Sequence, residues 1–227
     1  MELEAETPIS EAATATRLRV TEIFYSLQGE ARTVGCPTVF IRLTGCPLRC
    51  DYCDTEYAFT EGEWMSIDDI LARTAAYTPC YVTVTGGEPL AQRACGELLV
   101  RLCDAGYEVS LETSGALDIA TVDPCVSIVM DLKTPSSGEE SKNRYENIEL
   151  LAPKDQLKLV VRDRADYEWS RRKIGEYNLV ERCEVLMSPV HGRMNPTQLA
   201  EWILADRLPV RMQVQLHKLL WSDERGR

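Results

Sequence analysis

The stretch Thr38–Cys53 reads TVFIRLTGCPLRCDYC and joins an apolar segment directly to a loop with three cysteines. The apolar segment, residues 38–44, is rich in Val, Phe, Ile and Leu and carries Arg42 as its single charge, which predicts a buried β-strand. The loop spaces Cys46, Cys50 and Cys53 as Cys-x3-Cys-x2-Cys. Because thiolates are soft ligands that suit zinc or iron–sulfur clusters, this stretch predicts a metal site at the end of a strand.

Three thiols in one loop leave one metal position without a protein ligand. An iron–sulfur cubane is usually held by four cysteines, and a structural zinc ion also takes four protein ligands. An open iron is a position where a small molecule binds and receives an electron. A zinc knuckle is the alternative interpretation, and its fourth ligand would come from Cys36, Cys80 or one of the two histidines.

Extended apolar segments alternate with predicted helices along the chain. Several of the extended segments are apolar on both faces, as in parallel strands that are covered on both sides. The predicted strands are 18–25, 38–44, 81–85, 108–112, 126–132, 156–161, 184–187 and 210–216, and the predicted helices are 66–77, 91–105, 165–177 and 196–205. Ser66 and Asn195 are predicted helix caps. The alternation indicates an α/β fold, and too few strands follow Thr38 for a closed barrel, so we expect a partial, open (β/α)6-type barrel.

Polar motifs follow several of these predicted strands. Gly86-Gly87-Glu88-Pro89 follows one strand, Thr113-Ser114-Gly115 follows the next, and Asp131-Leu132-Lys133 ends a third. In parallel α/β folds the chemistry lies at the carboxyl ends of the strands. We therefore expect these motifs to meet the cysteine loop at one edge of the sheet.

The composition excludes several classes of protein. The net charge of −11 argues against a nucleic-acid partner, and no apolar run is long enough to cross a membrane. Residues 1–16 are expected to form a flexible leader before a single domain, residues 17–227. Nine cysteines without a secretion signal indicate the reducing cytoplasm, and the cysteines in or beside apolar stretches are expected to be small buried hydrophobes: Cys80, Cys95, Cys103, Cys125 and Cys183.

The cysteine loop and the Gly-Gly-Glu-Pro motif together resemble the radical S-adenosylmethionine superfamily, in which an aromatic residue such as Tyr52 also precedes the third cysteine. The resemblance implies a [4Fe–4S] cluster whose open iron chelates S-adenosylmethionine. One electron from the cluster then cleaves the cofactor to a 5′-deoxyadenosyl radical. Gly87 and Glu88 would contact the methionine amino group.

Further motifs, spread over nearly the whole chain from Thr21, resemble the 7-carboxy-7-deazaguanine synthase family: 27–30 (LQGE), 53–55 (CDT), 112–115 (ETSG), 131–133 (DLK) and 215–218 (QLHK). That family converts 6-carboxy-5,6,7,8-tetrahydropterin to 7-carboxy-7-deazaguanine with loss of ammonia, in queuosine and 7-deazapurine biosynthesis. The chain departs from the family pattern at Ala31, where a second glycine is common, and at Asp131-Leu132, where several members have Ser-Pro.

The resemblance implies a role for each matching residue. The cluster would be held by Cys46, Cys50 and Cys53, and Mg²⁺ by the hydroxyl of Thr55. The substrate would be contacted by Leu27, Gln28, Gly29, Arg42, Thr85 and His217. S-adenosylmethionine would be contacted by Tyr52, Gly87, Glu88, Thr113, Ser114, Asp131, Leu132, Lys133 and Ser188. No side chain is expected to act as a nucleophile.

The resemblance also implies a homodimer and an external electron donor such as a flavodoxin. Two other functions stay open at this point. A radical activase would use the same cysteine spacing to abstract hydrogen from a glycine of a large protein partner. A non-catalytic zinc or iron–sulfur interaction protein would need a closed, four-ligand site.

Overall fold

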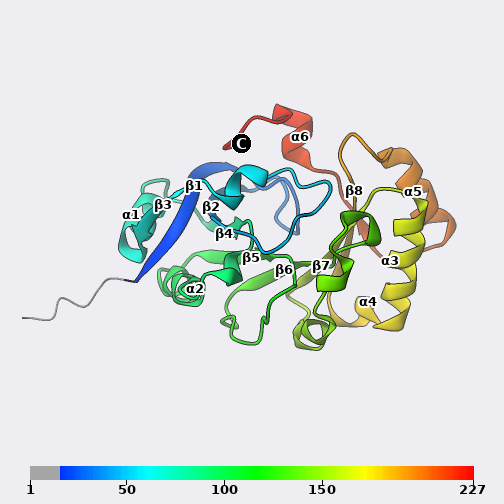
Figure 1. Ribbon diagram of the computed structural model, residues 1–227, viewed down its shortest axis with the longest axis horizontal. Coiled ribbons are helices and arrows are strands. Elements are labelled where there is room, and N and C mark those ends of the chain that lie inside the picture. The colour runs from blue at the N-terminus through cyan, green and yellow to red at the C-terminus, as the bar shows by residue number, and fades with distance from the viewer. Residues whose placement is uncertain (1–15) are drawn as a thin grey trace, which may run out of the picture.

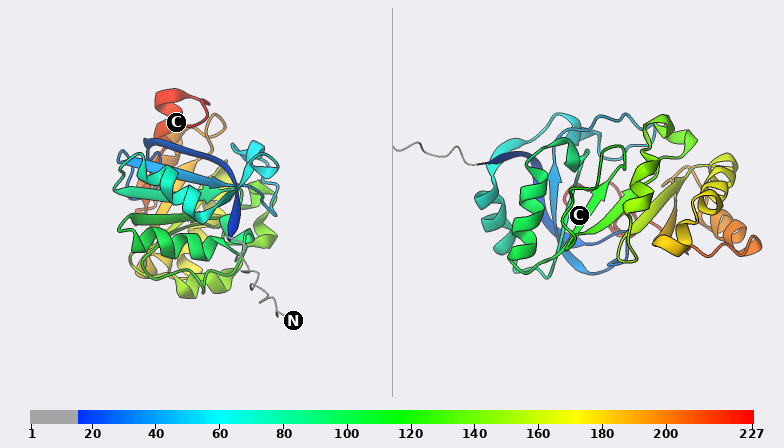
Figure 2. Two further views of the ribbon diagram at one scale, coloured as in Figure 1. Left: turned by 90° about the vertical axis from the view of Figure 1, so that its left-hand side faces the viewer. Right: turned by 90° about the horizontal axis from the view of Figure 1, so that it is seen from below.

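The structure, a computed structural model, describes residues 16–227 and contains one nine-stranded sheet in the order β3-β1-β2-β4-β5-β6-β7-β8-β9 (Figure 1). The strands are β1 (Arg17–Leu27), β2 (Pro37–Leu43), β3 (Glu63–Ser66), β4 (Tyr81–Gly86), β5 (Glu108–Thr113), β6 (Ser127–Asp131), β7 (Gln156–Val161), β8 (Glu184–Pro189) and β9 (Arg211–Met212). Strands β2 and β4–β9 pair in parallel, and β1 and β3 add an antiparallel margin. The sheet is twisted and its two margins do not pair (Figure 2), so the expected open α/β fold is confirmed.

The helices connect the parallel strands. They are α1 (Ile67–Ala75), α2 (Cys95–Asp104), α3 (Arg164–Glu176), α4 (Leu179–Arg182), α5 (Pro196–Ala205) and α6 (Leu216–Trp221), with short 3-10 helices at Glu56–Phe59, Pro89–Ala91, Pro135–Ser137, Glu140–Lys142 and Tyr145–Leu150. Both predicted caps are confirmed. The Ser66 hydroxyl accepts a hydrogen bond from the backbone N–H of Asp69, and the Asn195 side chain accepts from the two N–H groups that follow Pro196.

Two apolar clusters hold the helices against the sheet. One joins β1, β2, β4 and the start of β5 to α1 and α2, with Ile41, Val84 and Leu98 at its centre. The other joins β6, β7 and β8 to α3 and α5, and includes Leu159 and Tyr167. Figure 1 shows the two groups of helices at opposite ends of the molecule. The apolar stretches of the sequence thus form the body of the sheet and leave its carboxyl edge to the polar motifs.

The last predicted strand is wrong beyond its first residues. We expected residues 210–216 to be extended, but β9 covers only Arg211–Met212 and α6 begins at Leu216. The chain leaves the sheet because the backbone N–H of Leu216 donates to the carbonyl of Gly29, which draws the segment onto the carboxyl edge. The strand β3 and the helix α4 were not predicted from the sequence. The helix predicted for residues 91–105 begins at Cys95, because a 3-10 turn occupies residues 89–91.

The expectation of uniformly buried cysteines is also wrong. Cys95 and Cys183 are buried, but Cys103 is half-buried and both Cys80 and Cys125 are exposed. All nine thiols are free. The exposed ones lie in turns before β4 and β6, where an apolar neighbourhood in the sequence does not become a covered position in the fold.

Residues 1–15 of the expected leader lie outside the described residues, while the carbonyl of Thr16 accepts a hydrogen bond from the backbone of Ile67. Within the described part of the chain, no helix combines the length and apolar character needed to cross a membrane.

Candidate active site

A cavity of about 670 Å³ opens at the carboxyl edge of the parallel strands, within the range of small-molecule sites. Its wall includes most of the residues singled out in the sequence: Leu27, Gln28, Gly29, Arg42, Cys46, Cys50, Tyr52, Cys53, Thr55, Thr85, Gly87, Thr113, Ser114, Asp131, Lys133, Ser188 and His217. Glu88 and Leu132 are buried and do not line it. The motifs therefore meet at one edge, as expected.

The cysteine loop is fastened to the Gly-Gly-Glu-Pro turn. The backbone N–H of Gly87 donates to Leu43, and that of Glu88 donates to Gly45 at 2.7 Å. A Cβ added at Gly87 would lie 2.3 Å from the carbonyl oxygen of Gly45 and 2.8 Å from the Cβ of Cys46. Only glycine allows this approach, so the two motifs that carry the superfamily resemblance are one packed unit.

The three loop thiols suit a cluster better than a single ion. Burial raises the pKa of all three thiols, that of Cys50 to about 11, and nearby Lys133 acts in the opposite direction by favouring the thiolate. Cys46, Cys50 and Cys53 are not among the groups in the described chain whose ligand atoms lie within 4.8 Å of one another. A single zinc ion needs such convergence, whereas a cubane with several irons spans more widely separated thiols.

The zinc-knuckle alternative loses two of its proposed ligands. Cys36 precedes β2 and Cys80 precedes β4, so both lie at the amino ends of strands whose carboxyl ends carry the loop. The two histidines, His191 and His217, do line the cavity. A closed four-ligand site would thus depend on a histidine alone.

Asp131 and Lys133 form an ion pair of 3.0 Å at the end of β6, with both side chains largely buried. Burial acts to lower the pKa of Lys133, but Asp131, Cys50 and Tyr52 together outweigh it and raise the pKa. The other carboxylate oxygen of Asp131 and the hydroxyl of Ser188 are buried without a hydrogen-bond partner. Unpaired buried polar atoms are costly, and both residues line the cavity, so this wall is fitted to a polar ligand such as S-adenosylmethionine.

Glu88 points to protein groups. Its carboxylate accepts hydrogen bonds from the Thr113 hydroxyl at 2.9 and 3.0 Å, from the Ser114 backbone N–H at 2.7 Å and from the Ser114 hydroxyl at 2.5 Å. It also caps the 3-10 turn by accepting from the backbone N–H of Leu90. These hydrogen bonds tie the ends of β4 and β5 together, and the contact of Glu88 with the methionine amino group stays a prediction.

Arg42 is held in an aromatic recess. Its Nε donates to Glu22 at 2.7 Å, and its guanidinium lies 5.8 and 5.9 Å from the ring centres of Phe24 and Tyr57. Burial acts to lower the pKa of Arg42, but the combined effect of Tyr57, Glu22 and more distant Glu112 raises it. Within residues 16–227 only Nε has a hydrogen-bond partner, which leaves both terminal amino groups for a ligand carboxylate.

Gln28 is buried, and both ends of its side-chain amide form hydrogen bonds. The amide nitrogen donates to Thr83 at 3.2 Å, and the amide oxygen accepts from the backbone N–H of Glu30 at 3.2 Å. Thr85 donates to the carboxylate of Glu112 at 2.9 Å. Burial raises the pKa of Glu112 and outweighs the lowering effect of Lys158.

Sequence reasoning assigned no role to Lys158 and Glu30, which form a largely buried ion pair of 2.7 Å on the cavity wall. Lys158 also lies 3.7 Å from Asp131. A charged residue inside the strand sequence QLKLVV was the available signal, because an unpaired lysine is rarely buried. Asp54 was missed in the same way: it accepts hydrogen bonds from Thr55 at 2.8 Å and from Gln215 at 3.3 Å.

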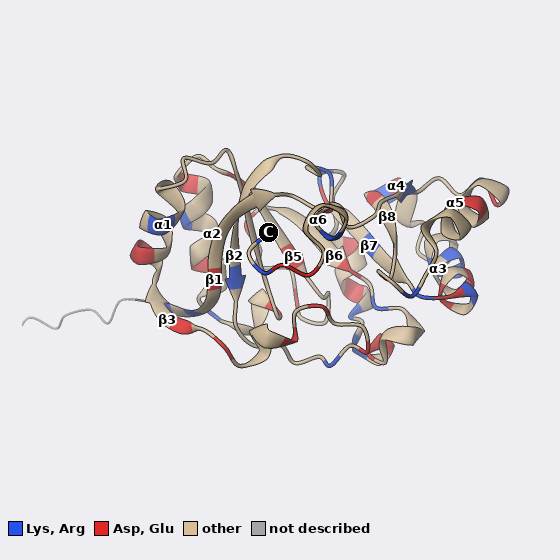
Figure 3. Cartoon of the chain, turned by 90° about the horizontal axis from the view of Figure 1, so that it is seen from above, with Lys and Arg blue, Asp and Glu red and all other residues tan. Residues whose placement is uncertain are grey.

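Helix α6 and the residues after it cover the cavity. The imidazole of His217 packs on Gly29, where an added Cβ would lie 2.1 Å from Nδ1. Arg225 stacks 3.8 Å over the ring of Tyr57, which in turn donates to Glu22. Figure 3 looks down on this edge and shows α6 and the end of the chain over the middle of the sheet.

Comparison with known proteins identifies the family. A sequence model of the radical SAM superfamily matches residues 40–149. The chain is 45% identical to 7-carboxy-7-deazaguanine synthase of Chlorobaculum tepidum over 94% of its own length and 99% of the relative, and 41% identical to that of Koribacter versatilis over 91% and 98%. The chain belongs to the 7-carboxy-7-deazaguanine synthase family.

The fold agrees with this family. The crystal structure of QueE from Escherichia coli superposes with a TM-score of 0.73 at 24% identity, over 88% of this chain and 95% of that one. As a radical SAM enzyme of the 7-carboxy-7-deazaguanine synthase family, the chain carries a [4Fe–4S] cluster and uses S-adenosylmethionine. This sets aside both the activase and the non-catalytic interaction protein.

Proposed function

We propose that the chain catalyses the radical-mediated ring contraction of 6-carboxy-5,6,7,8-tetrahydropterin to 7-carboxy-7-deazaguanine, with loss of ammonia, as a carbon–nitrogen lyase. The observation that carries this assignment is that the three loop cysteines and Arg42 line the same cavity. The cysteines supply a metal centre, and Arg42 supplies a buried cation for the carboxylate that the substrate brings.

The cluster and S-adenosylmethionine are assigned to one side of the cavity. Cys46, Cys50 and Cys53 would hold the cluster, which with S-adenosylmethionine would supply the radical chemistry for hydrogen abstraction from the substrate. The unpaired carboxylate oxygen of Asp131 accepts a hydrogen bond from the cofactor, and the unpaired hydroxyl of Ser188 donates one to it. The other cofactor contacts are assigned to Tyr52, Gly87, Glu88, Thr113, Ser114, Leu132 and Lys133. Glu88 also accepts hydrogen bonds from the hydroxyl groups of Thr113 and Ser114.

The substrate lies toward Arg42, between the end of β1 and α6. Arg42 binds its carboxylate, and Thr85 with Glu112 offers a hydroxyl and a carboxyl group to the ring nitrogens. Gln28 positions Glu30 and the β1 turn, while Leu27, Gly29 and His217 complete the wall. A radical reacts with whatever is nearest, so the enclosed position and fixed contacts direct it to one carbon.

Magnesium is assigned to Thr55. A hydroxyl alone binds Mg²⁺ weakly, because the ion prefers oxygen ligands of higher charge and retains waters. The carboxylate of Asp54 accepts the Thr55 hydrogen bond at 2.8 Å and supplies the negative charge that the hydroxyl lacks. Burial alone would raise the pKa of Asp54, but its hydrogen bonds with Thr55 and Gln215 and nearby Lys218 lower it, so the carboxylate is ionised. Substrate oxygens complete the shell.

We also assign a homodimer in the cytoplasm and an external one-electron donor such as a flavodoxin. Free thiols at all nine cysteines suit a reducing compartment. On α6, Leu219 is 66% exposed and Leu220 is 50% exposed, which supports a surface that a second copy covers. Light scattering of the anaerobic protein measures the oligomeric state.

The test is an anaerobic assay with S-adenosylmethionine, a reductant and 6-carboxy-5,6,7,8-tetrahydropterin, read by mass spectrometry for 7-carboxy-7-deazaguanine. Arg42→Ala should lower kcat/KM by about 10–100-fold, because a charge-assisted hydrogen bond contributes roughly 1.5–3 kcal/mol. Arg73→Ala is the matched control, since Arg73 forms an exposed ion pair with Glu63 far from the cavity wall.

Two outcomes would contradict the assignment. If the protein forms 5′-deoxyadenosine but no 7-carboxy-7-deazaguanine, the radical chemistry is supported and the assigned substrate is wrong. If the Arg42→Ala and Arg73→Ala variants have the same kcat/KM, Arg42 does not bind the substrate carboxylate.

A further inference from the structure

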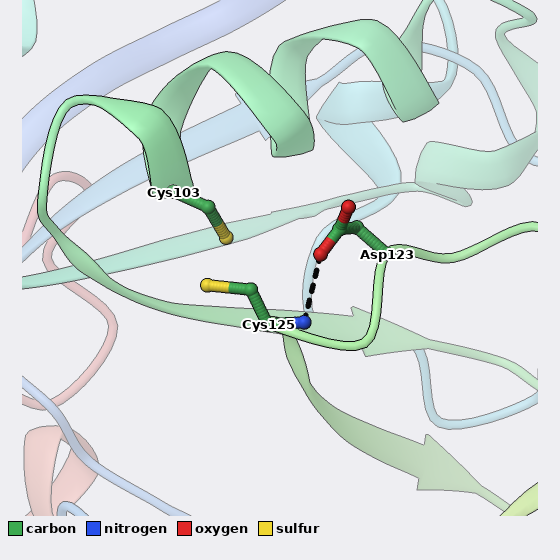
Figure 4. A group of neighbouring side chains, drawn as sticks. All are labelled: Cys103, Asp123 and Cys125. Atoms are coloured by element: carbon green, nitrogen blue, oxygen red, sulfur yellow. Dashed lines mark hydrogen bonds between the residues drawn. The ribbon is translucent and has the colours of Figure 1, made fainter.

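A second group of thiols lies at the opposite edge of the sheet, at the amino ends of the strands. Cys103 is in the last turn of α2, just before β5, and Cys125 is in the turn that leads into β6 (Figure 4). Cys103 is half-buried and Cys125 is exposed. The β5 and β6 strands separate both residues from the cavity, whose wall includes Thr113 and Asp131 at the other ends of these strands.

A carboxylate completes the group. Asp123 begins a turn in which the backbone N–H of Val126 donates to the Asp123 carbonyl at 3.0 Å, with Pro124 and Cys125 at the central positions. Oδ1 of Asp123 accepts from the backbone N–H of Cys125 at 2.8 Å, so the carboxylate is oriented beside the thiol. Figure 4 shows the two sulfur atoms beside each other and the Asp123 carboxylate turned toward the backbone nitrogen of Cys125.

The three ligand atoms converge. One atom from each of Cys103, Asp123 and Cys125 lies within 4.8 Å of the others, and no other such group of three occurs among residues 16–227. In a tetrahedral zinc site the Zn–S distance is about 2.3 Å and the Zn–O distance about 2.0–2.2 Å, which places neighbouring ligand atoms about 3.3–3.8 Å apart.

We propose that Cys103, Asp123 and Cys125 form a zinc site, separate from the active site, with a water molecule in the fourth, solvent-facing position. Two thiolates and one carboxylate neutralise the ion and leave one net negative charge. Binding breaks the S–H bonds of the two thiols and forms two Zn–S bonds and two Zn–O bonds, one to Asp123 and one to the water. It releases two protons without oxidation or reduction.

The group gathers ligands that can carry negative charge. The Cys125 thiol and the Asp123 carboxylate have ligand atoms within 4.8 Å of the Cys103 thiol, and a divalent cation attracts each of them in its anionic form. Asp123 is already fixed by its hydrogen bond to the Cys125 backbone, as ligands of metal sites are commonly held by outer contacts.

The site would join two separate segments. Cys103 belongs to α2, whose Leu98 and Leu102 are buried against the sheet, and Asp123 and Cys125 belong to the turn before β6. A zinc ion would tie the end of this helix to that turn. A disulfide between Cys103 and Cys125 is the competing outcome, but it would make no use of the Asp123 carboxylate that lies with them.

The experiment uses anaerobically purified, cluster-loaded protein equilibrated with Zn²⁺, so that the loop cysteines are occupied by iron. Metal analysis should give one zinc per chain, and zinc X-ray absorption should give two sulfur neighbours at about 2.3 Å and oxygen neighbours at about 2.0–2.2 Å. Competition with a chromophoric chelator gives the Kd. Cys125→Ser should raise the Kd beyond the roughly 10–100-fold that loss of an outer contact costs.

Cys80→Ser is the matched control, because Cys80 is also an exposed cysteine before a parallel strand but is outside the group. It should bind zinc with the affinity of the unchanged protein. The amide oxygen of Asp123→Asn can keep the hydrogen bond to the Cys125 backbone, but it carries no negative charge. Weaker zinc binding in this variant would therefore reflect loss of a ligand and not loss of the turn. Equal zinc affinity in Cys125→Ser and Cys80→Ser, fewer than two sulfur neighbours, or a Cys103–Cys125 disulfide in the anaerobic protein would each overturn the proposal.

Discussion

The two edges of the sheet each collect thiols, but in different ways. At the carboxyl edge, Cys46, Cys50 and Cys53 come from one short loop, and Lys133 nearby favours their ionised forms. At the amino edge, Cys103 and Cys125 come from two segments on either side of β5 and share their space with a carboxylate. Among the described residues, the ligand atoms of the second group lie within 4.8 Å of one another, and those of the first group do not.

This difference separates two kinds of metal site. A spread triad beside a cation and a large cavity suits a multi-iron cluster that receives electrons and a ligand. A converging pair with a carboxylate suits one divalent ion. In this chain the cysteine spacing predicted the group that comes from one loop and not the group that two segments form.

The largest expected effect is the loss of the iron–sulfur cluster when a cysteine of the loop at the carboxyl edge is replaced. Cys50→Ala removes one of the three loop ligands and should abolish both the visible absorption of the cluster and the formation of 5′-deoxyadenosine. Cys80→Ser should retain both, because Cys80 lies at the other edge and outside either group. Iron analysis and an anaerobic cleavage assay measure the effect. Cofactor cleavage by Cys50→Ala at the normal rate would show that the loop does not hold the cluster.

A glycine pair tests how tightly the carboxyl edge is packed. Gly87→Ala should disrupt cluster binding and lower activity by at least about 100-fold, because its Cβ would collide with the Gly45 backbone and with Cys46 beside it. Gly96→Ala is the control in α2: no atom lies within 4 Å of its Cβ, and alanine favours a helix over glycine by about 1 kcal/mol.

Iron content, activity and the melting temperature of both variants are the measurements. Gly96→Ala should match or exceed the unchanged protein in melting temperature. A Gly87→Ala protein with full iron content and activity would contradict the packing of the two motifs.

The smallest expected effect is a pH dependence of stability at the carboxyl edge. Burial lowers the pKa of His217, with Glu30 and Asp54 acting in the opposite direction, so the neutral imidazole is favoured in the fold. A lowered pKa contributes stability above the unfolded value of about 6.5 and loses it as the pH falls through the folded value. The melting temperature should therefore fall between pH 7.5 and 5.5.

His217→Gln should reduce that fall, because glutamine does not titrate, whereas Cys80→Ser should retain it. Circular dichroism of the anaerobic protein at both pH values measures the slope. A slope unchanged by His217→Gln would assign the pH dependence to another group.

The sequence alone determined the open α/β fold and the motifs at the carboxyl edge. The reason is physical: parallel strands must be apolar, their carboxyl ends must meet, and a three-cysteine loop carries its own spacing. The caps at Ser66 and Asn195 were predictable too, because they depend on residues within one turn of each cap.

Only the tertiary structure decided which polar atoms satisfy one another. Glu88 binds Thr113 and Ser114, Lys158 pairs with Glu30, and α6 replaces a predicted strand, because each depends on contacts between segments distant in sequence. The group of Cys103, Asp123 and Cys125 is likewise formed by folding. Local pattern specifies which residues belong to a strand or loop, whereas the distances between their side chains exist only after distant segments pack.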